Sequence, residues 1–143
     1  MPPTARFVIP HNIYAAVPAH RDVSYNEHVE DFVTLWVPFT DITEECGGVV
    51  VYKGSAKERP FSKLKEKGFW IEGSSTNGYQ GIHCKMRIGD ALLFNKWMLH
   101  RSAPNTSDHV RFSCDYRFFG SDQGSKKHYL EVATGKVIAP KSS

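Results

Sequence analysis

The sequence has no long hydrophobic run and few cysteines. No apolar stretch approaches the roughly 18 residues that a membrane-spanning helix needs, and the N-terminus lacks the apolar segment of a signal peptide. The three cysteines show neither disulfide-framework nor zinc-site spacing, so we expect reduced thiols. These absences argue against a membrane protein and a disulfide scaffold, and they predict a cytoplasmic protein.

A strong charge of either sign is also missing. Eighteen Lys and Arg against 15 Asp and Glu give a net charge of +3, which does not indicate nucleic-acid binding and favours an anionic small-molecule substrate. The chain has 143 residues, of which 41% are hydrophobic and 13% aromatic. That is enough for one domain with a single core.

Short apolar or alternating segments, separated by Gly, Pro and Asn, predict a mainly β fold. The expected strands are residues 5–9, 13–18, 19–24, 32–40, 48–53, 82–88, 91–95, 97–102, 109–119 and a tail hairpin near 129–139. The best match is a double-sheet jelly roll, that is, a cupin-like double-stranded β-helix with few short helices.

We expect one domain over residues 1–143, with its core at about 5–120 and a C-terminal tail or hairpin at 121–143. Residues 55–81 interrupt the strand pattern as a loop insertion, with one or two helical turns near 61–68. Such an insertion is either a lid over a site or a plain surface loop.

Three residues have the spacing of a metal site: His20 and Asp22 in PAHRDV, and His100 in WMLHRSAPN. On a strand, residues i and i+2 point to the same face, so His20 and Asp22 would project together and Arg21 would point away. Two His and one carboxylate form the facial triad that holds non-haem Fe(II) and leaves positions open for cosubstrate and O2. The competing interpretation is an ordinary pair on a surface strand.

The segment after His100 predicts a strand, a turn and a second strand. A hairpin centred on Asn105 and Thr106 would place Ser102 opposite His109, and His100 opposite Arg111, within one cavity. A guanidinium is a natural bidentate partner for a carboxylate, so Arg111 could anchor the far end of a dicarboxylate that chelates the metal.

These pieces resemble the phytanoyl-CoA dioxygenase family of Fe(II)/2-oxoglutarate oxygenases. The matching text is HRD at 20–22, TLWVPFTDITEECGGVVVYKGS at 34–55, GDALLFNKWMLHRSAPN at 89–105 and VRFS at 110–113. The resemblance covers about residues 5–120 and lacks the usual N-terminal region of the family. Arg21 and the GSA at 54–56 depart from the common family pattern.

The resemblance implies a role for each matched residue. His20, Asp22 and His100 would be the iron ligands, Arg111 would bind the distal carboxylate of 2-oxoglutarate, and Ser102 and Trp36 would line the cosubstrate pocket. The competing roles are a structural salt bridge for Arg111, a backbone hydrogen bond for Ser102 and core packing for Trp36. The implied reaction is hydroxylation of a small molecule with O2, releasing succinate and CO2.

Alternation over residues 110–118 places Arg111, Ser113, Asp115 and Arg117 on one face and the apolar residues on the other. Phe112, Tyr116 and Phe118 would then lie on an outer face that no long helix covers, which predicts a homo-oligomer or a fragment of a longer polypeptide.

Two other functions stay open. One is a cupin-type metal enzyme that does not use 2-oxoglutarate, and the other is a truncated or non-catalytic metal-binding domain.

Overall fold

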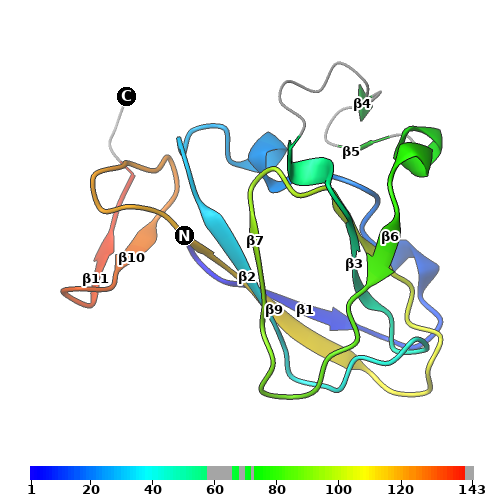
Figure 1. Ribbon diagram of the computed structural model, residues 1–143. Helices are drawn as coiled ribbons and strands as arrows, with labels where there is room; N and C mark the ends of the chain where they lie inside the picture. Colours follow the sequence, from blue (N-terminus) through cyan, green and yellow to red (C-terminus); the bar gives the residue numbers. More distant parts are fainter. Residues whose placement is uncertain (58–65, 68–69, 72, 141–143) are drawn as a thin grey trace.

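The computed structural model describes residues 1–57, 66–67, 70–71 and 73–140, which form two facing β-sheets (Figure 1). The larger sheet has the order β1 (Thr4–Val8), β9 (Arg111–Phe118), β2 (Val33–Pro38) and β7 (Leu92–Asn95). The smaller sheet has the order β6 (Gly81–His83), β3 (Gly48–Tyr52) and β8 (His100–Ala103). All strand pairs in both sheets are antiparallel.

Strands that are neighbours in the chain often lie in different sheets. The chain crosses from β2 to β3, from β6 to β7, and from β8 to β9, changing sheet each time. This alternation between two sheets is the jelly-roll, or double-stranded β-helix, arrangement that the sequence predicted.

The core lies between the two sheets. Trp36, Ile42, Cys46, Val49 and Phe94 form one buried cluster there. A second cluster consists of Ala19, Tyr52, Ile71 and Leu99, with the partly buried Tyr79 packed against it. Trp36, Val49 and Phe94 occupy inward-facing positions of β2, β3 and β7, so the apolar alternation of these strands helps to close the sandwich.

The remaining elements are short. Four 3₁₀ helices occur in the described parts of the chain: η1 (Ile13–Ala15), η2 (Asp22–Tyr25), η3 (Ser55–Lys57) and η4 (Gly73–Gly78). Two small hairpins pair β4 (Glu66–Lys67) with β5 (Trp70–Ile71), and β10 (Tyr129–Glu131) with β11 (Lys136–Ile138). Among the described residues, no helix is long and apolar enough to cross a bilayer.

Two predicted elements need correction. The strand expected at 13–18 is η1 followed by coil, and the strand expected at 19–24 is reduced to one β-bridge at His20 before η2 begins. Most of the segment near 61–68, where helical turns were expected, lies outside the described residues. The two residues of it that are described, 66–67, belong to β4. The tail hairpin is confirmed, and it projects to one side of the sandwich (Figure 1).

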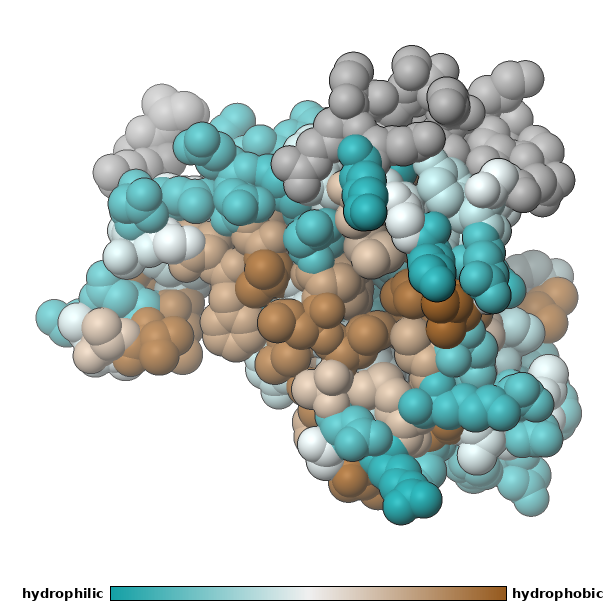
Figure 2. Space-filling model, viewed as in Figure 1, coloured by the Kyte–Doolittle hydropathy of each residue, from teal (hydrophilic) through white to brown (hydrophobic). Residues whose placement is uncertain are grey.

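The outer face of the larger sheet is apolar and partly open to solvent. Phe7, Leu93 and Phe118 are 66%, 62% and 46% exposed. Phe7 and Phe39 stack on Phe112, with ring centroids 4.3 and 4.8 Å away. Figure 2 shows part of this apolar surface around β7. The predicted outward position of the Phe112 side of β9 is therefore confirmed.

Candidate metal centre

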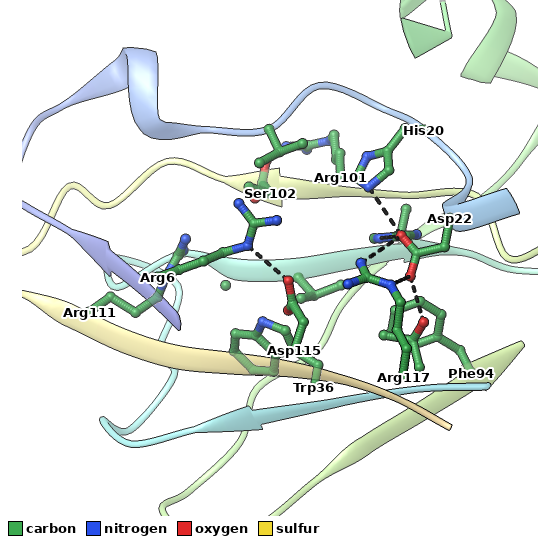
Figure 3. A pocket seen from close by; sticks show the side chains of 15 residues that line it. Arg6, His20, Asp22, Trp36, Phe94, Arg101, Ser102, Arg111, Asp115 and Arg117 are labelled. Atoms are coloured by element: carbon green, nitrogen blue, oxygen red, sulfur yellow. Dashed lines mark hydrogen bonds and ion pairs between the residues drawn. The ribbon is translucent and has the colours of Figure 1, made fainter. Parts of the chain in front are cut away.

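Three side chains from two distant parts of the sequence, His20 and Asp22 on one side and His100 on the other, meet at one end of a pocket between the sheets. His20 lies in a bridge to His100, His100 begins β8, and Asp22 begins η2. All three are buried, and one ligand atom from each lies within 4.8 Å of the others. Asp22 Oδ1 is 3.7 Å from His20 Nε2 and 3.9 Å from His100 Nε2. Figure 3 shows the His20 ring and the Asp22 carboxylate facing each other.

The sequence correctly predicted that His20 and Asp22 converge, but it placed them on a continuous strand that the structure does not contain. His20 is held by reciprocal backbone hydrogen bonds with His100, of 2.9 and 3.0 Å. Arg21 is extended, with φ −124° and ψ 138°, and the chain then turns into η2. One extended residue is enough to bring side chains i and i+2 to the same side, so no continuous strand is needed.

Both imidazoles present the same nitrogen to the site. The Nδ1 of His20 lies 2.8 Å from the Pro18 carbonyl oxygen, and the Nδ1 of His100 lies 3.0 Å from that of Met98. A carbonyl oxygen can only accept a hydrogen bond, so each Nδ1 is the donor. The Nε2 lone pairs are then free to face a cation, as metal-binding histidines require. Two such nitrogens and a carboxylate are a donor set suited to a divalent first-row metal.

Asp22 is fixed by two further side chains. The Thr34 hydroxyl donates to Asp22 Oδ2 at 2.5 Å, and Arg117 donates from Nε to Oδ2 at 3.2 Å and from Nη2 to Oδ1 at 3.3 Å. Burial alone would raise the pKa of the Asp22 carboxyl, but contacts with His20, Arg117, His100 and Thr34 outweigh it and hold that pKa well below its usual range. The carboxylate is therefore ionised at neutral pH.

His100 is neutral under the same conditions. Burial, followed by the charge of His20, lowers the pKa of His100 to about 4. The ring can therefore bind a metal at neutral pH without first losing a proton, which removes one cost of metal binding.

Arg111 lies at the other end of the same pocket (Figure 3). The predicted hairpin that would place it opposite His100 is wrong, because β8 pairs with β3 while β9 pairs with β1 and β2. The turn between β8 and β9 carries the chain from the smaller sheet to the larger one. His100 and Arg111 share the cavity because their strands face each other across it. Side-chain alternation is the same in both arrangements, so the sequence pattern could not distinguish them.

The pocket contains a polar atom that lacks a partner. Within the described part of the chain, the buried Nε of Arg111 has no hydrogen-bond partner. The Nη1 of Arg111 donates to the Ala103 and Cys46 carbonyl oxygens at 3.2 and 3.4 Å. Leaving a buried donor unsatisfied is costly, so this nitrogen fits a site whose acceptor is a ligand such as a carboxylate. Ser102 and Trp36 also line this pocket.

Among the pocket residues to which the sequence interpretation gave no role are Thr34, Arg117, Arg6 and Asp115. Arg6 donates from Nε to Asp115 Oδ2 at 3.0 Å. A signal for three of them was available, since Asp115 and Arg117 share the Arg111 face of β9 and Thr34 is two residues before Trp36 on β2. Their pairing with Asp22 and Arg6 could not be read from that alternation.

Comparison with known proteins places the chain in a family. Residues 4–113 match the model of the phytanoyl-CoA dioxygenase family. A 1-deoxypentalenic acid 11-beta-hydroxylase from Streptomyces exfoliatus is 32% identical over 112 residues, which are 70% of this chain and 40% of that enzyme. The chain thus spans about two fifths of the length of this relative.

Solved structures share the fold. The non-haem alpha-ketoglutarate-dependent carbocyclase SnoK from nogalamycin biosynthesis aligns with a TM-score of 0.70 at 17% identity, covering 86% of this chain and 50% of SnoK. The epimerase SnoN, solved with Fe3+, alpha-ketoglutarate and nogalamycin RO, aligns with a TM-score of 0.67 at 15% identity, covering 90% of this chain and 50% of SnoN. The family match extends over more than half of the sequence, and this chain therefore belongs to the phytanoyl-CoA dioxygenase family.

Proposed function

We propose that this chain forms the core of an Fe(II)- and 2-oxoglutarate-dependent dioxygenase that hydroxylates a small molecule and releases succinate and CO2. The observation that carries the proposal is the buried cluster of His20, Asp22 and His100, whose ligand atoms converge within 4.8 Å. The hydroxylase that resembles this chain, and the iron and alpha-ketoglutarate bound in SnoN, support it. Residues 5–120 would supply the oxygenase domain.

In this proposal His20, Asp22 and His100 hold the iron. The iron would supply the oxidation chemistry, while the protein supplies geometry, charge and a dry cavity. The backbone carbonyls of Pro18 and Met98 orient the two imidazoles. Thr34 and Arg117 keep the Asp22 carboxylate in place.

Arg111 would bind the distal carboxylate of 2-oxoglutarate. Its guanidinium is buried at the end of the pocket opposite the triad, and its Nε has no partner among the described residues. Ser102 and Trp36 would form the walls beside that cosubstrate. Phe94 is also buried and lies at the triad end of the pocket, with its ring centroid 4.7 Å from that of His100.

The test is an anaerobic titration of the metal-free protein with Fe(II) and then 2-oxoglutarate. A saturating visible metal-to-ligand charge-transfer band, lost in His100→Ala, supports the proposal. Bound iron without this band contradicts the use of 2-oxoglutarate and favours the cupin-type alternative. A band without succinate formation in the presence of O2 and any of a panel of small molecules favours a non-catalytic domain.

We also propose that a second copy of the chain covers the outer face of the larger sheet. The open side chains there include Phe7 on edge strand β1, which stacks on Phe112, and Leu93 on the other edge strand β7, both more than 60% exposed. An exposed apolar face of this kind marks an interface. Light scattering should show a dimer that Phe7→Glu dissociates. A wild-type monomer at micromolar concentration would exclude self-association.

A further inference from the structure

Two consecutive backbone carbonyl groups beside Arg111 are each held by a side chain from another strand. The Cys46 carbonyl oxygen accepts a hydrogen bond from Arg111 Nη1 at 3.4 Å. The next carbonyl oxygen along the chain, that of Gly47, contacts Nε2 of His83. A carbonyl oxygen can only accept, so Nε2 of His83 is the donor. The backbone that contacts the guanidinium is therefore itself held by a histidine.

His83 reaches this carbonyl from the outer face of the smaller sheet. It ends β6 and pairs with Val50 on the neighbouring strand β3 (Figure 1). Val49 belongs to the core cluster between the sheets, and Val51 packs against that cluster. Successive residues of a strand point to opposite faces and cross-strand partners share a face, so Val50 and His83 lie on the side away from the pocket. His83 and Arg111 thus hold neighbouring peptide groups from the two sides of the sheet.

The backbone between these two contacts has little conformational preference of its own. Gly47 and Gly48 have φ of +81° and +96°, a region that only glycine adopts readily. A pair of glycines has many accessible conformations, so its geometry must be fixed by its contacts. Just before the pair, the Glu45 carbonyl oxygen accepts from the N–H groups of residues 106–107 at 2.7 and 3.1 Å. The bond from His83 holds the peptide group that joins the two glycines.

The Arg111 guanidinium is packed closely against this backbone. A Cβ at Gly47 would lie 2.9 Å from Arg111 Nη1 and 2.5 Å from the Ala103 carbonyl oxygen. The same Ala103 oxygen accepts from Nη1 at 3.2 Å, and Arg111 is buried. A rotation of the Gly47 peptide group would therefore move the acceptors that set the direction of the guanidinium. Bidentate binding of a carboxylate depends on that direction.

We propose that His83 is a positioning residue for the cosubstrate. By holding the Gly47 carbonyl on the outer side of the sheet, it keeps the Cys46 carbonyl turned towards Arg111 and the guanidinium aimed into the pocket. His83 does not line that pocket, and its buried Nδ1 has no partner among the described residues, so the bond to Gly47 is what its ring supplies there. This inference rests on the proposed function, because it adds a residue to the proposed 2-oxoglutarate site.

The test compares three substitutions of His83. His83→Gln keeps an N–H donor at the same position along the side chain, His83→Asn places its amide too close to the backbone to reach Gly47, and His83→Leu has no donor. The anaerobic Fe(II) charge-transfer titration measures the affinity for 2-oxoglutarate, and calorimetry with Mn(II) measures metal affinity.

We expect His83→Asn and His83→Leu to weaken 2-oxoglutarate by about fivefold or more, the loss of one hydrogen bond of ordinary strength, with Mn(II) affinity within about twofold of wild type. His83→Gln should restore the affinity for 2-oxoglutarate. His109→Leu is the matched control, because it makes the same change at an exposed histidine that pairs with Asp108, and it should behave as wild type.

Three outcomes would overturn the role of His83. They are unchanged 2-oxoglutarate affinity in His83→Asn and His83→Leu, an affinity in His83→Gln as low as in His83→Leu, and a loss of Mn(II) affinity as large as that of 2-oxoglutarate. The second would mean that the shape of the ring matters and the donor does not. The third would mean a general loosening of the fold.

Glutarate binding to the metal-free chain separates this role from the oxygenase function, with Arg111→Met as the reference that should lose it. Glutarate binding that depends on Arg111 and weakens in His83→Asn, without a charge-transfer band in wild type, would keep the role of His83 and reject the use of 2-oxoglutarate. A wild-type band that His83→Asn leaves unchanged would keep the oxygenase function and reject this role. Binding of neither dicarboxylate would overturn both.

Discussion

Arg117 competes with a bound metal for the Asp22 carboxylate, and this competition can be measured. Arg117 reaches both carboxylate oxygens, including Oδ1, the atom that also faces the two imidazoles. In the metal-free protein this guanidinium compensates a carboxylate whose side chain is 1% exposed. A divalent cation at the triad would supply the same compensation and would repel Arg117. Replacing Arg117 should therefore destabilise the metal-free form more than the metal-bound form.

The change to make is Arg117→Met, which keeps most of the apolar stem and removes the charge. Breaking a fully buried ion pair costs about 3–5 kcal/mol. Arg117 is 15% exposed and Thr34 still donates to Asp22, so we expect a smaller loss. A loss of about 2–3 kcal/mol would lower Tm by about 7–10 °C for a chain of this length. Such a loss leaves the protein folded at 25 °C.

The assay is urea unfolding of wild type and variant, with and without saturating Mn(II) as an oxygen-stable substitute for Fe(II). With Mn(II) the loss should shrink to below about 1 kcal/mol, and by linkage the variant should bind Mn(II) roughly tenfold or more tightly than wild type. Arg6→Met is the matched control, because its partner Asp115 is not in the triad. Its loss of stability should be the same with and without metal. An Arg117→Met loss that does not change with Mn(II), or no loss at all, would refute this reasoning.

Three further predictions follow from the same pocket. Arg111→Met should weaken 2-oxoglutarate by about 2–4 kcal/mol, or roughly 30- to 1000-fold, with Fe(II) affinity retained; unchanged cosubstrate affinity in the charge-transfer titration would exclude the anchoring role. The pKa of His100 is lowered to about 4 in the folded protein, so folding favours the neutral ring. The free energy of unfolding is therefore highest above pH 6.5, and it decreases as the pH falls from 6.5 towards 4, where the unfolded chain takes up a proton that the folded one does not. Urea unfolding at pH 7 and pH 4.5 should show a loss of about 2–3 kcal/mol that is absent in His100→Gln, and identical pH dependence of the two proteins would count against a buried neutral ring. Gly47→Ala should destabilise the fold by at least about 2 kcal/mol and weaken 2-oxoglutarate, because Gly47 has φ +81° and a Cβ there would lie 2.5 Å from two carbonyl oxygens and 2.9 Å from Arg111 Nη1. Gly124→Ala, where the added atom meets nothing within 4 Å, is its control in thermal melts, and equal stability of the two variants would contradict the close-approach argument.

The sequence determined the identity of the candidate site residues and which way each strand faces. The spacing of His20 and Asp22 was sufficient because a single extended residue between them aligns their side chains. Alternation along 110–118 correctly separated the pocket side of β9, with Arg111 and Arg117, from its outer apolar side. These are local properties, set by the two-residue repeat of an extended backbone, so they can be read from one segment at a time.

Only the tertiary structure decided which strands are partners and which charges meet. The same alternation is compatible with a β8–β9 hairpin and with two strands in facing sheets, and the sheet order selected the second arrangement. The pairing of Arg117 with Asp22, across 95 residues of sequence, depends on that order. So does the position of the Trp70 ring beside His20. Contacts between distant segments depend on how whole sheets pack, and the periodicity of a single segment carries no information about its partner.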